Sequence, residues 1–245
     1  MDPLTITAAS GMRARMESLD MLANNIANTE TGGYKTDREF YNLYTSSEAM
    51  APGSDDPATL PVIERNYTDF SQGAMRVTSN SLDFGIQGRG FFSVDSPSGV
   101  AYTRNGSFQL TSTGKLVNAD GYTVRSASGQ PVTLDPSLSV EVAADGTINQ
   151  SGQTAGKLAV LDFANQGDLV KQGNTLFRLA DPKTKPVATA AEVRQGRLES
   201  SNVGNSESVI RLVSVMRQFD MLQKAVHLGQ TMNRKAIDEV AKVGT

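Results

Sequence analysis

Apolar residues near the N-terminus recur at steps of three and four, and they predict one long amphipathic helix. Asp2 is a good N-cap, Pro3 suits the first helical position, and Gly32-Gly33 suits the end of the segment. A helix of this extent is roughly 40 Å long at about 1.5 Å per residue. Its apolar stripe consists of Ala8, Met12, Met16, Leu19, Leu22, Ala23 and Ile26.

The C-terminal residues predict a second long helix, from about Ser206 to Lys242, with a length of roughly 55 Å. Asn205 is a suitable N-cap, and Glu207 suits the first turn because the helix dipole favours a negative charge there. Two amphipathic helices at opposite ends most simply bury their stripes against each other or against other chains. The apolar heptad positions of this helix are Val209, Leu212, Met216, Phe219 and Val226, and Ile237 and Val240 rejoin the register.

Between the helices, from about Tyr67 to Gln195, short runs rich in aromatic and β-branched residues predict strands. Asn105-Gly106, Asp120-Gly121 and Asp145-Gly146 are tight-turn dipeptides. The fold class is therefore α+β, in which two long terminal helices form an α-helical coiled-coil region and enclose an inserted, mainly antiparallel β domain. The expected parts are an N-terminal helix (1–35), a linker or extended segment (36–66) that includes the Ser- and Pro-rich residues 46–61, the β domain (67–200) and a C-terminal helix (201–245).

Three asparagines, Asn24, Asn25 and Asn28, lie in the turns of the N-terminal helix although asparagine is a poor helix former. Amides beside an apolar stripe indicate contacts on several sides, with hydrogen bonds that fix the register as a buried Asn does in a coiled coil. For Asn28, a position at the C-terminal end of the helix is an equally good interpretation. The methionines of both helices suit a surface that packs against copies of itself, and ordinary core filling is the alternative.

Composition excludes several classes of function. The formal charge of −3 argues against a nucleic-acid binder, and the absence of cysteine excludes disulfides and thiolate metal sites. No apolar run is long enough to span a bilayer, and no secretory signal peptide is visible.

Isolated motifs do not predict chemistry. Gly88-Arg89-Gly90 lacks the third glycine of a dinucleotide fingerprint and is interpreted as a turn before a strand. The stretch from Asn118 to Gly121 lacks most ligands of a calcium loop and reads as a hairpin turn. His227, the only histidine, is interpreted as a packed or surface residue. No catalytic residue, metal site or cofactor is therefore expected.

Four blocks of sequence, in the order typical of the family, resemble the bacterial flagellar rod and hook proteins. The blocks are ANNIANTETGGYK (Ala23 to Lys35), SLDFGIQGRGFFSV (Ser81 to Val94), YTRNGSFQLTSTGKLVNADGYTV (Tyr102 to Val124), and GRLESSNV (Gly196 to Val203) followed by VIRLVSVMRQFDMLQKAV (Val209 to Val226). The chain departs from the usual pattern at Gly32, where Pro is usual, at Gly85, where Ala is usual, and at Phe219-Asp220, where Tyr-Glu is common.

This resemblance implies a structural subunit of the periplasmic rod of the basal body, exported through the flagellar type III apparatus without a cleaved signal peptide. It implies that the terminal helices are unfolded in the free chain and form the inner coiled-coil tube of the rod on assembly, with the β domain outside. Its partners would be copies of itself and other rod proteins. The chain length and the segment from Arg65 to Phe84 are more similar to the proximal rod protein than to the distal rod protein or the longer hook protein.

We expect the assembly interface to transmit torque through a stiff tube. Two alternatives remain, a secreted β-rich hydrolase, which predicts a carboxylate pair in a cleft, and an adhesin, which predicts an exposed aromatic patch. The expected interface residues are Leu19, Leu22, Asn24, Asn25, Ile26, Asn28, Leu212, Met216, Arg217, Phe219 and Val226.

Overall fold

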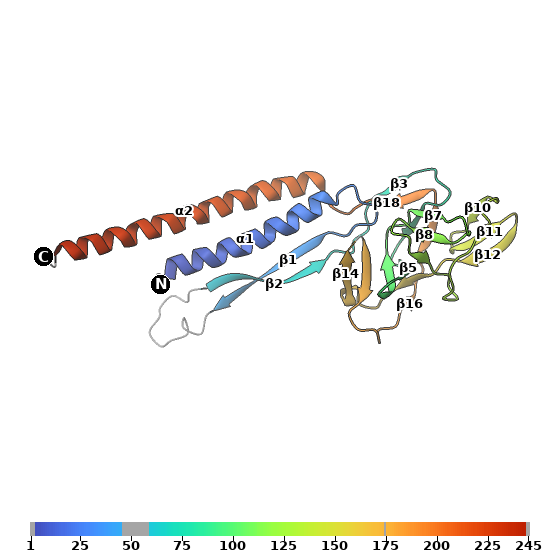
Figure 1. Cartoon of the computed structure of the whole chain (residues 1–245), viewed down its shortest axis with the longest axis horizontal. Helices are drawn as coiled ribbons and strands as arrows, with labels where there is room; N and C mark the ends of the chain where they lie inside the picture. Colours follow the sequence, from blue (N-terminus) through green and yellow to red (C-terminus); the bar gives the residue numbers. More distant parts are fainter. Residues whose placement is uncertain (1–2, 46–58, 174, 244–245) are drawn as a thin grey trace. The chain divides into compact units, whose positions relative to one another are not determined.

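The structure, a computed structural model, describes residues 3–45, 59–173 and 175–243, and it has an α+β fold (Figure 1). The chain forms two compact units. The helical unit comprises Met1–Ala27, Asp37–Tyr67 and Gly204–Thr245, and the β unit comprises Asn28–Thr36 and Thr68–Val203.

The helical unit contains two helices that pack along each other and a two-stranded hairpin (Figure 1). Apolar periodicity explains why both terminal segments are helical, since each buries one side against the other. The elements are α1 (Pro3–Ala27), β1 (Asp37–Thr45), β2 (Thr59–Thr68) and α2 (Asn205–Val243).

The ends of the helices differ from the sequence expectation. Helix α1 ends at Ala27, before Gly32-Gly33, because Asn28 starts a turn in which its carbonyl oxygen accepts the Thr31 amide and its side chain accepts the Thr31 hydroxyl. At the start of α2, the first helical hydrogen bond runs from the Ser208 amide to the Gly204 carbonyl, so Gly204 rather than Asn205 occupies the cap position.

The segment expected to be a linker or extended chain contains β1 and β2. Most of its Ser- and Pro-rich part, residues 46–58, and the expected N-cap at Asp2 lie outside the described residues.

The β unit is built on a nine-stranded sheet in which every described pairing is antiparallel. The strand order is β14-β15-β6-β5-β9-β8-β7, and β13 pairs with both β5 and β16. The bounds are β5 (Phe91–Ser96), β6 (Gly99–Thr103), β7 (Phe108–Leu110), β8 (Leu116–Asn118), β9 (Thr123–Val124), β13 (Val160–Asp162), β14 (Leu169–Gly173), β15 (Leu176–Leu179) and β16 (Val187–Ala188).

Smaller sheets complete the unit. One has three strands in the order β10-β11-β12, and two pairs join strands from the two ends of the unit, β4 with β17 and β3 with β18. The bounds are β3 (Met75–Val77), β4 (Phe84–Gln87), β10 (Val140–Val142), β11 (Thr147–Gln150), β12 (Gln153–Lys157), β17 (Glu192–Gln195), β18 (Arg197–Glu199) and the 3-10 turn η1 (Gln166–Asp168).

Two apolar clusters form the core of this unit. The larger includes Phe84, Phe92, Phe108, Leu116 and Ile148, and the smaller contains Phe91, Tyr102, Phe163, Leu169 and Phe177. Edge-to-face ring contacts such as Tyr102–Phe163, at 4.8 Å between centroids, order the smaller cluster.

The turn dipeptides behave in two ways. Gly121 and Gly146 adopt left-handed φ values of 82° and 85° in tight turns, as predicted. The Asn105-Gly106 turn prediction is wrong, because β6 and β7 are not neighbours in the sheet. Gly106 serves a close backbone approach instead, since a Cβ there would lie 1.7 Å from the Phe84 carbonyl oxygen.

Candidate functional site

One face of α2 is used within the chain. Val215 and Gly229 are buried, and Leu212, Phe219, Leu222 and Val226 are half-buried, so the buried positions follow each other at steps of three and four. The register differs from the sequence expectation, since Val209 and Met216 are about half exposed and Val215 and Leu222 take the inner positions. Both registers have heptad spacing, so spacing alone did not distinguish them.

Helix α1 turns a face of small residues inward. Ala8, Gly11, Ala14 and Ser18 are buried at steps of three and four. A Cβ on Gly11 would lie 3.3 Å from Leu222 Cδ1, so the glycine allows α2 to approach closely. Of these four residues only Ala8 belongs to the predicted apolar stripe, because Gly11, Ala14 and Ser18 are small or polar and do not stand out in an apolar pattern. Among the predicted residues of α1, Leu22 is buried, and Leu19 and Ile26 are half-buried.

The asparagines of α1 have different environments. Asn25 is 2% exposed, and its amide bonds the backbone of Asp37 in both directions, donating to the carbonyl at 2.9 Å and accepting from the amide at 3.1 Å. This pairing fixes the start of β1 against α1. Asn24 is exposed, and Asn28 lies in the turn after the helix.

A charged network also joins the hairpin to both helices. The buried carboxylate of Glu39 in β1 accepts hydrogen bonds from the Ser18 hydroxyl of α1 and from the Arg211 guanidinium of α2. Because each partner comes from a different element, this single carboxylate sets the relative register of the three elements.

The outer face of α2 is rich in apolar side chains that remain exposed in the described part of the chain. We define this outer face as Val209, Ile210, Val213, Met216 and Met221, whose exposed fractions run from 44% to 71%. At about 100° per residue, Ile210, Val213 and Met221 lie on the side of the helix opposite Val215 and Leu222, and Val209 and Met216 flank that side. Exposed apolar residues gathered on one helix face are unusual for a surface that faces only water.

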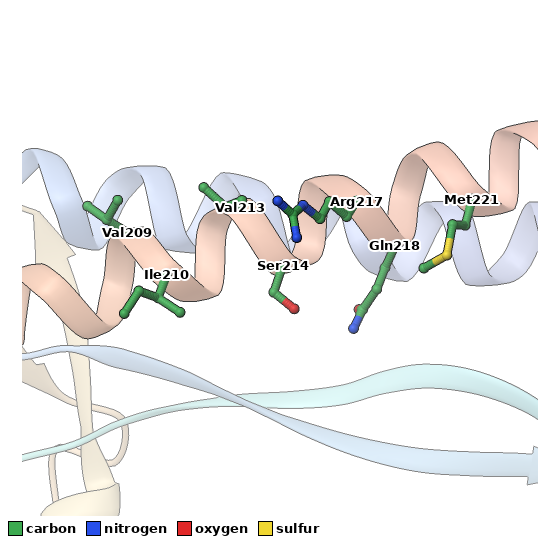
Figure 2. A pocket seen from close by; sticks show the side chains of 7 residues that line it. All are labelled: Val209, Ile210, Val213, Ser214, Arg217, Gln218 and Met221. Atoms are coloured by element: carbon green, nitrogen blue, oxygen red, sulfur yellow. The ribbon is translucent and has the colours of Figure 1, made fainter.

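A shallow groove runs along this face (Figure 2). It is lined by Val209, Ile210, Val213, Ser214, Arg217, Gln218 and Met221. In Figure 2, Ile210, Ser214 and Gln218 project to the same side of the helix. Gln218 Oε1 is shielded from solvent and accepts no hydrogen bond in the described part of the chain. The groove therefore combines apolar walls with an unsatisfied acceptor and a cation at Arg217.

Other candidate sites of the sequence have structural roles. Gly88-Arg89-Gly90 turns the chain into β5, and the Asn118 side chain accepts the amides of Asp120 and Tyr122 within the β8–β9 hairpin. His227 is exposed on α2. Over residues 3–45, 59–173 and 175–243, no cluster of potential metal ligands occurs. In the same ranges, no helix has the length and hydropathy needed to cross a bilayer.

Three protein-family models match this chain, one in each helix and one in the β unit. Residues 7–35 match the flagella basal body rod protein family, residues 85–150 match the flagellar hook protein FlgE/F/G D1 domain, and residues 194–239 match the C-terminal family of flagellar basal body rod FlgEFG proteins. The first and third of these matches contain most of α1 and α2, including the outer face of α2.

Individual relatives match along nearly the whole chain. The flagellar basal-body rod protein FlgF of Caulobacter vibrioides is 30% identical over 99% of this chain and 100% of its own length. FlgF of Rhizobium meliloti is 31% identical over 94% and 95%, and FlgG of Caulobacter vibrioides is 32% identical over 92% and 95%. These comparisons do not favour the hydrolase or adhesin alternatives. The chain belongs to the flagellar basal-body rod protein family of FlgF and FlgG, and it is a structural subunit of the rod.

Proposed function

We propose that this subunit assembles with copies of itself and with other rod proteins through the outer face of α2, so that the terminal helices form the coiled-coil tube of the rod. The main support for this proposal is the apolar outer face. In the single chain it leaves large apolar side chains in contact with water, such as Ile210, which is 71% exposed. Full burial of one such side chain contributes about 1.5–3 kcal/mol, and the gain recurs at every subunit of a polymer.

The groove on α2 supports a protein partner over a small ligand. It lies on one helix, and its apolar lining is Val209, Ile210, Val213 and Met221, the last of which adapts its shape to neighbours that differ from site to site. Of its polar lining residues, the exposed Arg217 would pair with a carboxylate of a neighbouring subunit. Met216 and Asn24, which are exposed, belong to the same proposed interface.

The other predicted interface residues contribute indirectly in this proposal. Leu19, Leu22, Ile26, Leu212, Phe219 and Val226 are buried or half-buried in the single chain, and Asn25 holds the hairpin. They shape the helix pair that presents the outer face, and Asn28 shapes the turn that follows α1. The resulting tube would transmit torque and enclose the export channel, with no catalytic role for the subunit.

A charge placed on the outer face tests the interface. Ile210→Lys should prevent rod assembly, because a lysine ammonium would be desolvated at the subunit contact, and should leave the fold intact because Ile210 is mostly exposed. Gln153→Lys is the matched control, since it adds the same charge at an exposed position of β12 in the β unit, away from both helices. The measurements are electron microscopy of isolated basal bodies, swimming motility and thermal unfolding of each purified variant. Complete rods built from Ile210→Lys would refute the proposed interface.

The position within the rod is proposed to be proximal, as in FlgF. The supporting observation is that the chain and the Caulobacter FlgF match over 99% and 100% of their lengths, although FlgG relatives have similar identity. The proposed location is the periplasmic rod, reached through the flagellar type III apparatus. Expression in strains that lack either FlgF or FlgG tests the position. Restored motility only in the strain without FlgG would reverse the assignment.

A further inference from the structure

Three charged side chains lie together in the interior of the β unit. Lys35, Arg104 and Glu199 are each exposed by 2% or less. Lys35 Nζ lies 2.6 Å from Glu199 Oε1, and Arg104 Nη1 lies 3.2 Å from Glu199 Oε2. Charged residues are rarely buried so completely unless they are paired, so the pairing with Glu199 is what allows Lys35 and Arg104 to lie in the interior.

The two cations depend on one carboxylate. Burial lowers the pKa of Lys35 and that of Arg104, and the attraction of Glu199 opposes the effect for both groups. Removal of the carboxylate would leave two buried cations without their counter-ion, which is far more costly than the loss of a surface pair. Glu199 is therefore the central member of the cluster.

Glu199 and the nearby Asn202 join three segments that are distant in sequence. Glu199 Oε1 accepts the Gly73 amide at 2.9 Å, and the Glu199 carbonyl accepts the Gly33 amide at 2.7 Å. Asn202 accepts the Thr36 amide and hydroxyl, both at 2.8 Å, and donates to the Asp69 carbonyl at 2.8 Å. We call this arrangement the clasp, formed by Lys35, Arg104, Glu199 and Asn202.

Close backbone approach makes the clasp tight. A Cβ on Gly33 would lie 2.3 Å from the Asn105 amide nitrogen, and a Cβ on Gly73 would lie 2.0 Å from the Ser200 carbonyl oxygen. Only glycine allows the segments to approach this closely at both places. The segment that follows α1 and the segment that precedes α2 are thus held side by side on the β unit.

The helices themselves have much less burial to hold them. Among the described residues of α1 and α2, the buried apolar side chains are Ala8, Ala14, Leu22 and Val215, whereas the β unit contains two apolar clusters. Helices with so little buried area open at lower free energy than a packed core. The clasp lies between these regions along the chain, since α1 ends at Ala27 and α2 begins at Asn205.

We propose that Glu199 is a positioning residue that keeps the C-terminal end of α1 and the N-terminal end of α2 adjacent while the helices themselves open and close. This inference rests on the proposed function in one respect, that the paired helices are the assembling part. Because the end of α1 and the start of α2 are held together, the two helices pair as parts of one closed loop, at high effective concentration.

Hydrogen exchange of the unassembled full chain tests the proposal. In the wild type, the amides of Gly33, Thr36 and Gly73, which donate to Glu199 or Asn202, should exchange far more slowly than amides along α1 and α2. Glu199→Gln should accelerate exchange at these three clasp amides by about a hundredfold or more. The same variant should also accelerate the helix amides around Gly11 and Leu222, although Glu199 bonds only residues of the β unit. The last effect separates positioning from simple stabilisation of the β unit.

Matched variants make the result decisive. Glu192→Gln removes an exposed partner of Arg194 and should change neither set of amides. Asn202→Ala removes the bonds of Asn202 to Thr36 and Asp69 without leaving a buried charge, and it should give the same pattern if Glu199→Gln does not fold. The proposal is overturned if wild-type clasp and helix amides exchange at one common rate, or if opening the clasp leaves the helix amides unchanged. Because the chain is unassembled throughout, these outcomes are independent of whether Ile210→Lys blocks rod formation.

Discussion

Gly33 should be irreplaceable, whereas its neighbour Gly32 should tolerate alanine. Gly33 has a φ of 70°, in the left-handed region, where an alanine costs about 1 kcal/mol or more. A Cβ on Gly33 would also lie 2.3 Å from the Asn105 nitrogen and 2.5 Å from the Arg104 carbonyl carbon, and backbone atoms cannot rotate away. The necessary shift would lengthen the 2.7 Å hydrogen bond from the Gly33 amide to Glu199, at a further cost of about 1–3 kcal/mol.

We therefore expect Gly33→Ala to lower the free energy of unfolding of the β unit by about 3 kcal/mol, the sum of these contributions. At Gly32 a Cβ would meet Asn105 Oδ1 at 3.4 Å, which is close to ordinary contact, so Gly32→Ala should remain within about 1 kcal/mol of the wild type. Urea unfolding followed by the amide NMR signals of β5 and β6 measures both variants. Equal stability of the two variants, or a Gly33→Ala chain as stable as the wild type, would show that the close approach does not govern this turn.

Two further predictions concern other parts of the chain. Asn25→Ala should destabilise the helical unit by about 2–3 kcal/mol, because it removes both hydrogen bonds to the Asp37 backbone. Asn24→Ala, at an exposed position, should cost under about 1 kcal/mol. Thermal unfolding by circular dichroism compares the two variants, and equal unfolding midpoints would contradict the role assigned to the Asn25 hydrogen bonds. The Lys157 hydrogen bond, together with bonds from Thr147, lowers the pKa of Asp145 from 3.8 to about 2, so the stabilisation from this exposed carboxylate should be complete above the ordinary pKa and lost as the pH falls through about 2. Carboxyl NMR titration measures this pKa, and Lys157→Gln should raise it; an unchanged value would exclude Lys157 as the principal cause.

Local patterns predicted the parts of the fold that depend on local chemistry. Apolar spacing gave the existence of α1 and α2, and Asp120-Gly121 and Asp145-Gly146 gave two turns, because their left-handed glycines suit any tight connection. The register of α2 was not predictable in this way. The helix has apolar residues on two sides, so Met216 and Val215 both fit a heptad, and only packing against α1 selects between them.

The clasp was beyond the reach of sequence reasoning for a different reason. Lys35 and Glu199 are 164 positions apart, and no local pattern marks them as partners. Lysine and glutamate are usually solvated, so the default expectation for each is the surface. The role of Asn25 was similarly hidden, since its spacing fits a contact between chains as well as it fits the observed bond to Asp37.

The two-sided helix α2 has a consequence for how growth of an assembly could stop. If a subunit packs one face of α2 against its own α1 and its outer face against a different surface of a neighbour, the contact is head-to-tail, and it does not close on itself unless the rotation between subunits completes a ring. Each added subunit then exposes a fresh copy of the surface that bound it. Such a polymer has no intrinsic length, so its termination requires a different chain whose exposed surface does not repeat the outer face.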